Sequence, residues 1–336
     1  MIRKNLRIGL VGATGMVGET FIQLLNEEKV SVQELRPFAS EKSLGQSITY
    51  ENKQWPIQIL KPDCFKGLDL VFFSSGDPIS KEWAPEAEKS GAYAIDNSAA
   101  FRMSDNHLLV TPEVNGHLLA ENPQPQVIAN PNCSTIQLVV ALNPLKKFGL
   151  KKVHVATYQA VSGGGKEAQN ELTSQMKNLS ENKKIQAPQD FPHQILFNCI
   201  PEIGGFDEQG FCSEEMKIIN ETKKILQLPK LQISAFTVRV PVLNGHSEAV
   251  WAEFEKDVTR EDVLAAFREQ EGLKVIDNPK NHAYPHVVEA SGKNPVYVGR
   301  VHKDLNLPNT WIFWVVADNI RKGAALNGLQ IAAKLF

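Results

Sequence analysis

The residue best placed for covalent chemistry is Cys133, in the run NPNCSTIQLVVAL. Pro131 and Asn132 predict a turn and the apolar run after them predicts a helix, so the thiol would lie at a helix N-terminus. The helix dipole and the N–H groups of the first turn favour a thiolate there. The same N–H groups could bind an oxyanion formed on an acyl group attached to sulfur. We therefore interpret Cys133 as a nucleophile, with a buried structural thiol as the alternative.

A nucleophilic cysteine needs a proton-transfer group close to it, and His246 is the best candidate among the eight histidines. It follows Asn244-Gly245, a dipeptide typical of a tight turn, between two β-type runs, which predicts an exposed imidazole. Arg239 lies on the strand that enters this turn, where its planar guanidinium could bind a carboxylate through two hydrogen bonds. Taken alone, both could equally be ordinary surface residues.

Three glycines, Gly12, Gly15 and Gly18, lie between a predicted strand at 6–11 and a predicted helix at 16–28. Glycine permits a tight turn and lets the backbone approach a pyrophosphate, while the helix N-terminus offers N–H groups to phosphates. The GxxGxxG spacing departs from the usual GxGxxG fingerprint. Its position at the first strand–helix turn favours dinucleotide binding over a purely structural turn.

The end of the second predicted strand, 32–38, bears on which dinucleotide binds. Glu34 lies near the distance at which an acidic residue holds the ribose hydroxyls of NAD, but the strand continues to Phe38. The loop beyond it carries two hydroxyls and a cation: Ser40, Lys42 and Ser43. These groups suit a 2′-phosphate and predict NADP, with a solvated loop as the alternative.

The elements that must position these residues change in pattern near residue 132. Before it, short apolar runs alternate with helices, which is typical of βαβ units and a parallel sheet. The predicted strands are 6–11, 32–38, 68–74, 92–96 and 127–129, and the predicted helices are 16–28 and 80–90. We expect a first domain of residues 1–131 with a C-terminal helix, 319–336, returning to it.

The second domain, residues 132–318, has more strands than helices. The predicted helices are 135–148 and 259–270, with an amphipathic one at 319–335. The predicted strands are 152–159, 232–242, 248–254, 296–301 and 311–317. These runs could form one broad antiparallel or mixed sheet.

The composition excludes several classes of protein. The chain has 336 residues, of which 42% are hydrophobic and 22% charged, so it is neither disordered nor collagen-like. A net charge of −2 argues against nucleic-acid binding through bulk charge. No apolar stretch reaches the roughly 18–20 residues that span a bilayer, which argues against a membrane partner.

The four cysteines include no CxxC pair, so neither a disulfide framework nor a metal site is expected. Three of them are expected to be small packing residues: Cys64, Cys199 and Cys212. We expect a soluble, reduced, cytoplasmic protein.

Several motifs occur together and in order, and with them the sequence resembles the aspartate-semialdehyde dehydrogenase family over essentially its whole length. The motifs are GATGMVG from Gly12, SAAFR ending at Arg102, NPNCST around Cys133, YQAVSGGG around Gln159, EEMKIINETKKI around Lys217 and RVPVLNGHSE from Arg239 to His246. The resemblance implies an α/β plus α+β fold, with a Rossmann-like dinucleotide-binding domain and a mixed-sheet catalytic and dimerisation domain. It also implies a homodimer.

The activity implied by the resemblance is reductive dephosphorylation of L-4-aspartyl phosphate by NADPH, giving L-aspartate 4-semialdehyde and phosphate. The reaction belongs to the aspartate-derived pathway to lysine, threonine, methionine and diaminopimelate. No metal would take part.

Residue roles follow motif by motif. Cys133 would be the nucleophile that forms an acyl thioester, and His246 the acid/base. Gln159 would position the substrate, Arg239 would bind its α-carboxylate and Glu214 would face its amino group. Two cations would bind the phosphate: Arg102 and Lys217. The NADP contacts would be Gly12, Thr14, Gly15, Met16, Val17, Ser40, Lys42, Ser43, Ser162, Gly163 and Asn319.

Three alternatives remain open. N-acetyl-gamma-glutamyl-phosphate reductases share this architecture and acyl-phosphate chemistry, but they place a glycine before the cysteine, where this chain has Asn132. A glyceraldehyde-phosphate dehydrogenase would share the covalent chemistry without the motif order. The chain could also be an inactive paralogue that serves as a binding or scaffold protein. The joint presence of the catalytic set argues against that: Cys133, Gln159, Arg239 and His246.

Overall fold

The computed structural model of the chain describes residues 5–336, which form two compact units. Unit 1 consists of the residues up to Asn132 together with Ala324–Phe336, and unit 2 is Cys133–Gly323. The expected divisions lay at 131/132 and 318/319, so the chain returns to unit 1 five residues later than expected. Residues 319–323 stay with unit 2 because they hydrogen-bond within it. The Gly323 N–H, for example, donates to the Asp318 carbonyl at 3.0 Å.

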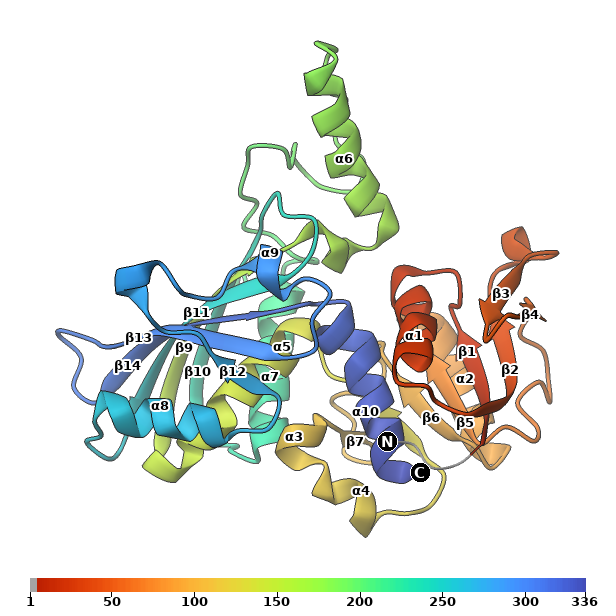
Figure 1. Cartoon of the computed structure of the whole chain (residues 1–336), viewed down its shortest axis with the longest axis horizontal. Coiled ribbons are helices and arrows are strands. Elements are labelled where there is room, and N and C mark those ends of the chain that lie inside the picture. The colour runs from red at the N-terminus through yellow and green to blue at the C-terminus, as the bar shows by residue number, and fades with distance from the viewer. Residues whose placement is uncertain (1–4) are drawn as a thin grey trace. The chain divides into compact units, whose positions relative to one another are not determined.

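Unit 1 is built on a six-stranded sheet in the order β2-β1-β5-β6-β8-β7, in which every pair is parallel (Figure 1). The strands are β1 (Leu6–Val11), β2 (Val32–Phe38), β5 (Leu70–Phe73), β6 (Tyr93–Asp96), β7 (Leu108–Leu109) and β8 (Val127–Ala129). β1 has β2 on one side and β5 on the other, so the sheet has a topological switch point at the carboxyl end of β1. The predicted parallel sheet is confirmed.

The helices of unit 1 are α1 (Met16–Glu27), α2 (Asp77–Lys89), α3 (Pro112–Asn115), α4 (His117–Glu121) and α10 (Leu326–Leu335). α10 packs against α1, α3, α4 and β6. The C-terminal helix predicted from residue 319 becomes α-helical only at Leu326, after a π-helical segment at Arg321–Ala325. A short hairpin that the sequence did not predict, β3 (Ser47–Tyr50) with β4 (Lys53–Pro56), completes the unit.

Unit 2 is built on a six-stranded mixed sheet in the order β10-β9-β11-β14-β13-β12. The strands are β9 (Leu150–Gln159), β10 (Gln232–Arg239), β11 (His246–Phe254), β12 (Leu273–Val275), β13 (Val296–Lys303) and β14 (Thr310–Ala317). β10 with β9 and β12 with β13 are parallel pairs, and the others are antiparallel. Buried residues alternate with more exposed ones along β9 and β11, so the sheet has a covered face and a more open one. The predicted mixed sheet, and with it the predicted fold class, is confirmed.

The helices of unit 2 are α5 (Cys133–Leu142), α6 (Lys166–Ser180), α7 (Ser213–Leu226), α8 (Arg260–Glu269) and α9 (Val287–Ala290). α5, α7 and α8 pack against the sheet, and α5 also packs against α7. The single helix predicted at 135–148 is in fact α5 followed by a 3-10 segment, Asn143–Phe148. Pro144 explains the change, because it has no N–H to continue the α-helical hydrogen bonds.

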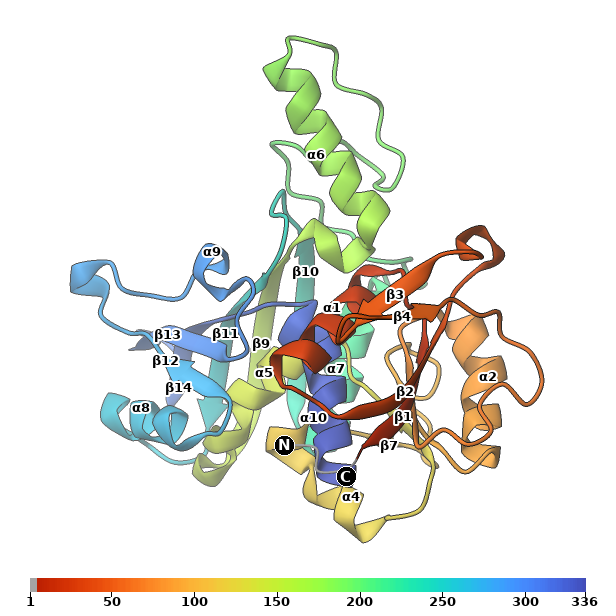
Figure 2. The same ribbon diagram turned by 45° about the vertical axis from the view of Figure 1, so that its right-hand side comes forward.

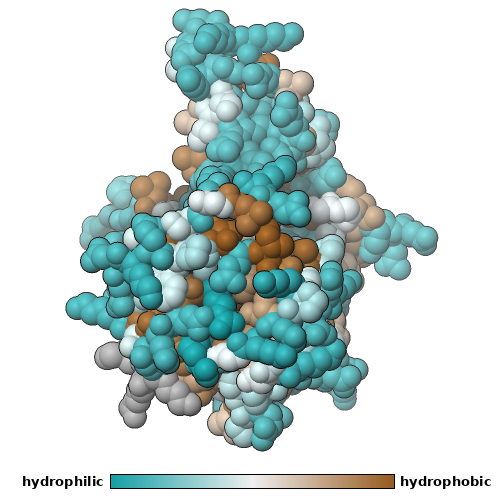
Figure 3. All heavy atoms as spheres, turned by 90° about the vertical axis from the view of Figure 1, so that its right-hand side faces the viewer, coloured by the Kyte–Doolittle hydropathy of each residue, from teal (hydrophilic) through white to brown (hydrophobic). Residues whose placement is uncertain are grey.

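Helix α6 projects from unit 2 away from its sheet, as two views show (Figure 1, Figure 2). The projecting part is coloured mostly hydrophilic (Figure 3), in agreement with its sequence KEAQNELTSQMKNLS. A small apolar cluster anchors its base: Val161, Leu172, Ile195, Leu196 and Ile200.

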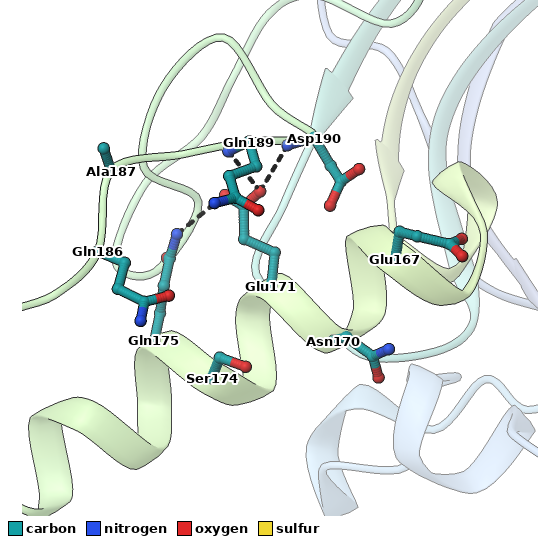
Figure 4. A pocket seen from close by; sticks show the side chains of 9 residues that line it. All are labelled: Glu167, Asn170, Glu171, Ser174, Gln175, Gln186, Ala187, Gln189 and Asp190. Atoms are coloured by element: carbon teal, nitrogen blue, oxygen red, sulfur yellow. Dashed lines mark hydrogen bonds between the residues drawn. The ribbon is translucent and has the colours of Figure 1, made fainter.

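The segment that follows α6 is tied back to the helix by polar side chains (Figure 4). One Glu171 carboxylate oxygen accepts the N–H groups of Gln189 and Asp190, at 2.9 and 2.7 Å. Gln175 donates to the other oxygen at 3.0 Å and accepts the Leu196 N–H at 2.9 Å. These groups line a polar hollow of about 290 Å³. Since the Glu171 carboxylate already accepts three N–H groups, we interpret the hollow as part of the structure that fixes this segment.

Within residues 5–336, no helix is long and apolar enough to cross a membrane. In the same part of the chain, no three His, Cys, Asp or Glu side chains are grouped so that they could hold a metal ion.

Candidate active site

Cys133 is the first residue of α5, so the predicted position of the thiol at a helix N-terminus is confirmed. Its side chain is partly exposed, whereas the nine residues that follow it in α5 are buried. The chain passes very close to it at Gly323, where a Cβ atom would lie 2.8 Å from the Cys133 Cβ. A side chain at position 323 would therefore displace the cysteine, which explains the glycine in physical terms.

His246 is fully buried, so the prediction of an exposed imidazole is wrong. The tight turn is present, with Gly245 at φ +90°, but His246 is the first residue of β11 and its side chain lies on the covered face of the sheet. A turn dipeptide predicts the path of the backbone and not what packs over the next side chain. Here Gly163 packs over it: a Cβ at that position would lie 3.3 Å from the His246 Nε2.

One ring nitrogen of His246 is held by the backbone. The Ala160 N–H donates to Nδ1 at 3.1 Å, so the neutral imidazole carries its proton on Nε2. Nε2 has no hydrogen-bond partner among the described residues. Burial, helped by the nearby charge of Arg239, lowers the pKa of His246 to about 3. The group is thus a neutral hydrogen-bond donor in the protein without substrate.

Arg239 ends β10 and is also buried, at 6% exposure. Its Nη1 donates to the Ala160 carbonyl at 2.7 Å, so the backbone N–H and carbonyl of one residue position both His246 and Arg239. Burial lowers the pKa of Arg239, whereas the charges of Glu214 and Cys133 raise it. A guanidinium has five N–H donors, and it remains charged at neutral pH even after such a shift.

Glu214, in the first turn of α7, brings two more predicted residues together. Its Oε1 accepts from the Gln159 carboxamide at 3.4 Å and its Oε2 accepts from the Lys217 ammonium at 3.2 Å. Gln159 ends β9, directly beside Arg239 in the parallel pair. Glu214 and Gln159 are buried, and the Lys217 side chain is about a third exposed, 36%. The buried carboxylate of Glu214 therefore lies near the Gln159 carboxamide and near two cations, Lys217 and Arg239.

The turn before His246 is fixed by a carboxylate that the sequence did not single out, Asp318. One of its oxygens accepts from the Asn244 carboxamide and the Gly292 N–H, both at 2.7 Å. The other accepts the N–H groups of Ile320 and Arg321, at 2.9 and 2.7 Å. Asp318 thereby joins the turn to residues 320–323, and the last of these, Gly323, packs against Cys133.

Two of the predicted cofactor residues in unit 2 belong to the same network. Asn319 accepts the Gly245 N–H at 2.8 Å, and its carboxamide nitrogen donates to the Ser162 hydroxyl at 3.0 Å. Both side chains are almost fully buried, at 2% exposure. Their contacts within unit 2 are structural.

In unit 1, the glycine loop has the shape that a bound pyrophosphate needs. Gly12 has φ +83°, and a Cβ there would lie 2.7 Å from the Ser74 hydroxyl oxygen. A Cβ at Gly18 would lie 2.4 Å from the Gly12 carbonyl oxygen, so the helix can approach the loop only because residue 18 is glycine. The first turn of α1 begins at Gly15 without a side-chain cap. Its N–H groups are thus of the kind that phosphates bind.

The loop after β2 adjoins the glycine loop, because the N–H groups of Gly12 and Ala13 donate to the Phe38 carbonyl at 2.9 and 3.1 Å. Lys42 and Ser40 are exposed there, while Ser43 is buried at 9%. The other cofactor residues predicted in unit 1 are partly exposed or exposed: Thr14, Gly15, Met16 and Val17.

Two charged residues of unit 1, Glu34 and Arg102, form contacts with other residues of the same unit. Glu34 lies within β2 and pairs with Arg36 at 2.6 Å, away from the carboxyl end of the strand. Arg102 is buried, at 7%, and donates to the backbone carbonyls of Asn130 at 2.9 Å and Asn97 at 2.8 Å. Arg102 therefore has a structural role near the end of β8 in addition to any ligand contact.

The structure thus gathers seven predicted residues of unit 2: Cys133, Gln159, Gly163, Glu214, Lys217, Arg239 and His246. Among the other cysteines, Cys64 and Cys212 are buried, as predicted, but Cys199 is exposed and the prediction of a packing residue there is wrong. It follows a segment, Leu196 to Asn198, whose turns leave it at the surface. Sequence reasoning missed Ala160, Asp318 and Gly323, which act through backbone atoms or close packing.

Comparison with known proteins agrees with this geometry. Residues 7–122 match the family described as semialdehyde dehydrogenase, NAD binding domain, and residues 142–322 match semialdehyde dehydrogenase, dimerisation domain. Aspartate-semialdehyde dehydrogenase of Aquifex aeolicus is 46% identical, over 98% of this chain and 97% of the relative. The Bacillus subtilis protein of that name is 44% identical, over 99% and 98%. The chain belongs to the aspartate-semialdehyde dehydrogenase family.

Solved structures of the family share the whole fold. Aspartate semialdehyde dehydrogenase II from Vibrio cholerae, complexed with ASA, has a TM-score of 0.94 and 39% identity, covering 99% of this chain and 98% of that one. The enzyme with NADP from Candida albicans has a TM-score of 0.78 and 25% identity, covering 99% and 98%. The predicted membership of the aspartate-semialdehyde dehydrogenase family is confirmed over the full length.

Proposed function

We propose that this protein catalyses the NADPH-dependent reductive dephosphorylation of L-4-aspartyl phosphate to L-aspartate 4-semialdehyde and phosphate. The observation that carries the proposal is the grouping in unit 2 of a cysteine at a helix N-terminus with a buried histidine, arginine and glutamate. The Vibrio cholerae relative complexed with ASA supports the substrate class. We place the reaction in the cytoplasm, in the aspartate-derived pathway to lysine, threonine, methionine and diaminopimelate.

Cys133 supplies the electron pair in the first step. Its thiolate adds to the acyl carbon, and the bond from that carbon to the phosphate oxygen breaks, leaving an acyl thioester and free phosphate. The N–H groups at the start of α5 stabilise the oxyanion of the addition. His246 adds a further donor, because its proton is held on Nε2 by the Ala160 contact at Nδ1.

The charged residues account for the ends of the substrate. Arg239 binds the α-carboxylate and Glu214 the α-ammonium group, while Gln159 orients the acyl group between them. We assign the leaving phosphate to Lys217 and Arg102. A substrate with an acetylated amine would offer no positive charge to Glu214, leaving a buried carboxylate that opposes its binding.

The glycine loop suits a pyrophosphate, since α1 begins there at Gly15 without a side-chain cap and offers the N–H groups of its first turn. When bound, NADPH supplies the hydride that reduces the thioester to the aldehyde. We assign the 2′-phosphate to Ser40, Lys42 and Ser43, and the remaining contacts to the predicted residues of the glycine loop and to Ser162, Gly163 and Asn319. The ion pair of Glu34 with Arg36 supports NADP, because it engages the acidic side chain of β2 within the strand.

The deciding experiment follows NADPH absorbance in both directions of the reaction. Purified protein should oxidise L-aspartate 4-semialdehyde only in the presence of phosphate or arsenate, since the thioester needs an oxyanion to release the acyl group. Reduction should consume aspartyl phosphate in the opposite direction. Similar kcat/KM with N-acetylglutamyl semialdehyde would instead favour the N-acetyl-gamma-glutamyl-phosphate reductase activity.

Lys42→Ala is expected to weaken NADP binding about 10–150-fold and NAD binding far less, because a charge-assisted hydrogen bond to a phosphate contributes about 1.5–3 kcal/mol. Fluorescence titration with both dinucleotides measures the two effects. Lys81→Ala, which removes an exposed lysine from α2, serves as the control and should change neither affinity. Equal affinity of the unmodified protein for NAD and NADP would contradict our interpretation of this loop.

We also propose a homodimer formed through the more open face of the sheet in unit 2. Two aromatic side chains on that face are exposed, Tyr158 at 40% and Phe236 at 57%. Beside them, Tyr284, Ile312 and Trp314 help to line a mainly apolar hollow of about 400 Å³. The matching dimerisation-domain family supports a second copy of the chain as the partner. Light scattering in solution should give twice the mass of one chain.

A further inference from the structure

Two buried polar side chains, Glu248 and Gln137, lie further along the elements that begin with His246 and Cys133. Glu248 is the second residue after His246 on β11, so both point to the covered face of the sheet. Gln137 lies one helical turn after Cys133 on α5, so these two share a side of the helix. Glu248 is 0% exposed and Gln137 is 1% exposed. Helix α5 thus carries both Cys133 and Gln137, and strand β11 carries both His246 and Glu248.

Neither side chain has a hydrogen-bonding partner among the described residues. Both carboxyl oxygens of Glu248 and both amide atoms of Gln137 lack a partner at hydrogen-bond geometry within the described residues. An ionised carboxylate would be very costly in such a place, so the carboxyl is neutral. Burial raises the pKa of Glu248 well above its usual range, and the neighbouring Gln137 carboxamide lowers it only in part.

A neutral carboxyl and a carboxamide are complementary. The carboxyl has one O–H donor and a carbonyl acceptor, and the carboxamide has N–H donors and a carbonyl acceptor. Each side chain can therefore supply the hydrogen-bonding partners that the other lacks among the described residues. The cross-strand neighbour of Glu248 on β9 is Thr157, whose hydroxyl accepts from the Gln159 carboxamide at 3.3 Å. Glu248 therefore lies beside the part of β9 that leads to Gln159.

We propose that Glu248 and Gln137 act as a positioning pair, in which a carboxyl and a carboxamide join β11 to α5 and so fix His246 relative to Cys133. Neither residue contacts the reacting atoms. The pair acts through the elements that it joins: a shift of α5 along the sheet moves Cys133 with it, and the distance between the thiol and the His246 Nε2 changes. The inference rests on the proposed function only in taking Cys133 as the reactive thiol.

The test compares variants that separate folding from positioning. Glu248→Leu and Gln137→Leu each leave a buried polar group unpaired, so both should lose stability and lower kcat about 10–100-fold, the effect of misplacing a catalytic group by about 1 Å. The double leucine variant removes both polar groups, so much of the thermal stability should return while kcat stays low. Glu248→Gln keeps a complementary pair and should retain kcat within about threefold.

The matched control is Val250→Ala, at the next buried position of β11 beyond Glu248. It loses core packing and hence stability, yet it should keep kcat, since it changes no polar contact. Recovery of kcat in the double leucine variant would overturn the proposal, because stability alone would then explain the losses. Equal loss of kcat in Glu248→Gln and Glu248→Leu would also overturn it.

A second readout does not need substrate or dinucleotide. The rate at which iodoacetamide alkylates Cys133 should fall about 10-fold or more in the double leucine variant and stay near the original in Glu248→Gln and Val250→Ala. If the leucine variants do not fold, the proposal is tested with the exchanged variant Gln137→Glu/Glu248→Gln, which keeps one carboxyl and one carboxamide. A folded exchanged variant that has lost kcat would overturn the proposal. Alkylation of a different cysteine in the unmodified protein would contradict the proposed function itself.

Discussion

Replacement of Cys133 by alanine should reduce turnover by about 10⁴-fold or more, because no other described group at the start of α5 can form the acyl thioester. Dinucleotide binding should be unchanged, since Cys133 is not among the residues to which we assign contacts with NADP. Stopped assays of NADPH oxidation measure the first effect, and fluorescence titration the second.

Mass spectrometry of the trapped intermediate gives the matching positive result. Incubation with an acyl phosphate and without NADPH should add the acyl mass to the peptide that contains Cys133. Cys199→Ala is the appropriate control, because Cys199 is an exposed thiol of the same unit and its removal should leave the adduct unchanged. An adduct on Cys64, Cys199 or Cys212, or turnover retained by Cys133→Ala, would contradict the covalent mechanism.

Replacement of His246 by asparagine should lower kcat about 10²–10⁴-fold, the range covered by loss of an oxyanion donor or of a proton-transfer group. KM for the semialdehyde should change much less, because Arg239, Glu214 and Gln159 remain to bind it. A variant that keeps near-normal kcat across the pH range would show that another residue handles the proton.

The buried imidazole also has a consequence for stability that the same variant measures. In the unfolded chain the imidazole takes up a proton near pH 6.5, whereas in the folded protein it does so only near pH 3. Between these values the unfolded state binds more protons, so the free energy of unfolding falls as the pH falls, by up to about 1.4 kcal/mol per unit. His246→Asn removes this contribution, and its unfolding free energy should therefore fall less steeply than that of the unmodified protein below pH 6.5.

Local signals in the sequence were enough to place most strands and the reactive cysteine. Pro131-Asn132 followed by an apolar run predicts a helix start from the local sequence, and α5 does begin at Cys133. Helix α7 was harder, because its N-terminal cap is Cys212, whose backbone N–H donates to Glu215 at 3.0 Å. Cysteine is not a typical cap, and no helix was predicted over this part of the sequence.

The surroundings of the catalytic residues depend on contacts between distant segments. His246 is buried because the 161–164 turn and Arg239 pack over it, and no pattern near residue 246 encodes that. Ala160 acts only through its N–H and carbonyl groups, so its side-chain type carries no signal. Glu214, Gln159 and Lys217 were named from the resemblance alone, and their contacts with one another were not predicted.

The carboxylate of Asp318 has a consequence for redesign of the protein. It accepts four N–H groups, two on each oxygen, and donates to none. Asparagine has almost the same shape, but its NH₂ group would face at least one of these donors, so the smallest chemical change at this position is a poor substitute. The turn that carries His246 is therefore not a transferable loop. Anyone grafting it onto another scaffold would have to bring residues 318–323 with it, as a second segment of fixed sequence.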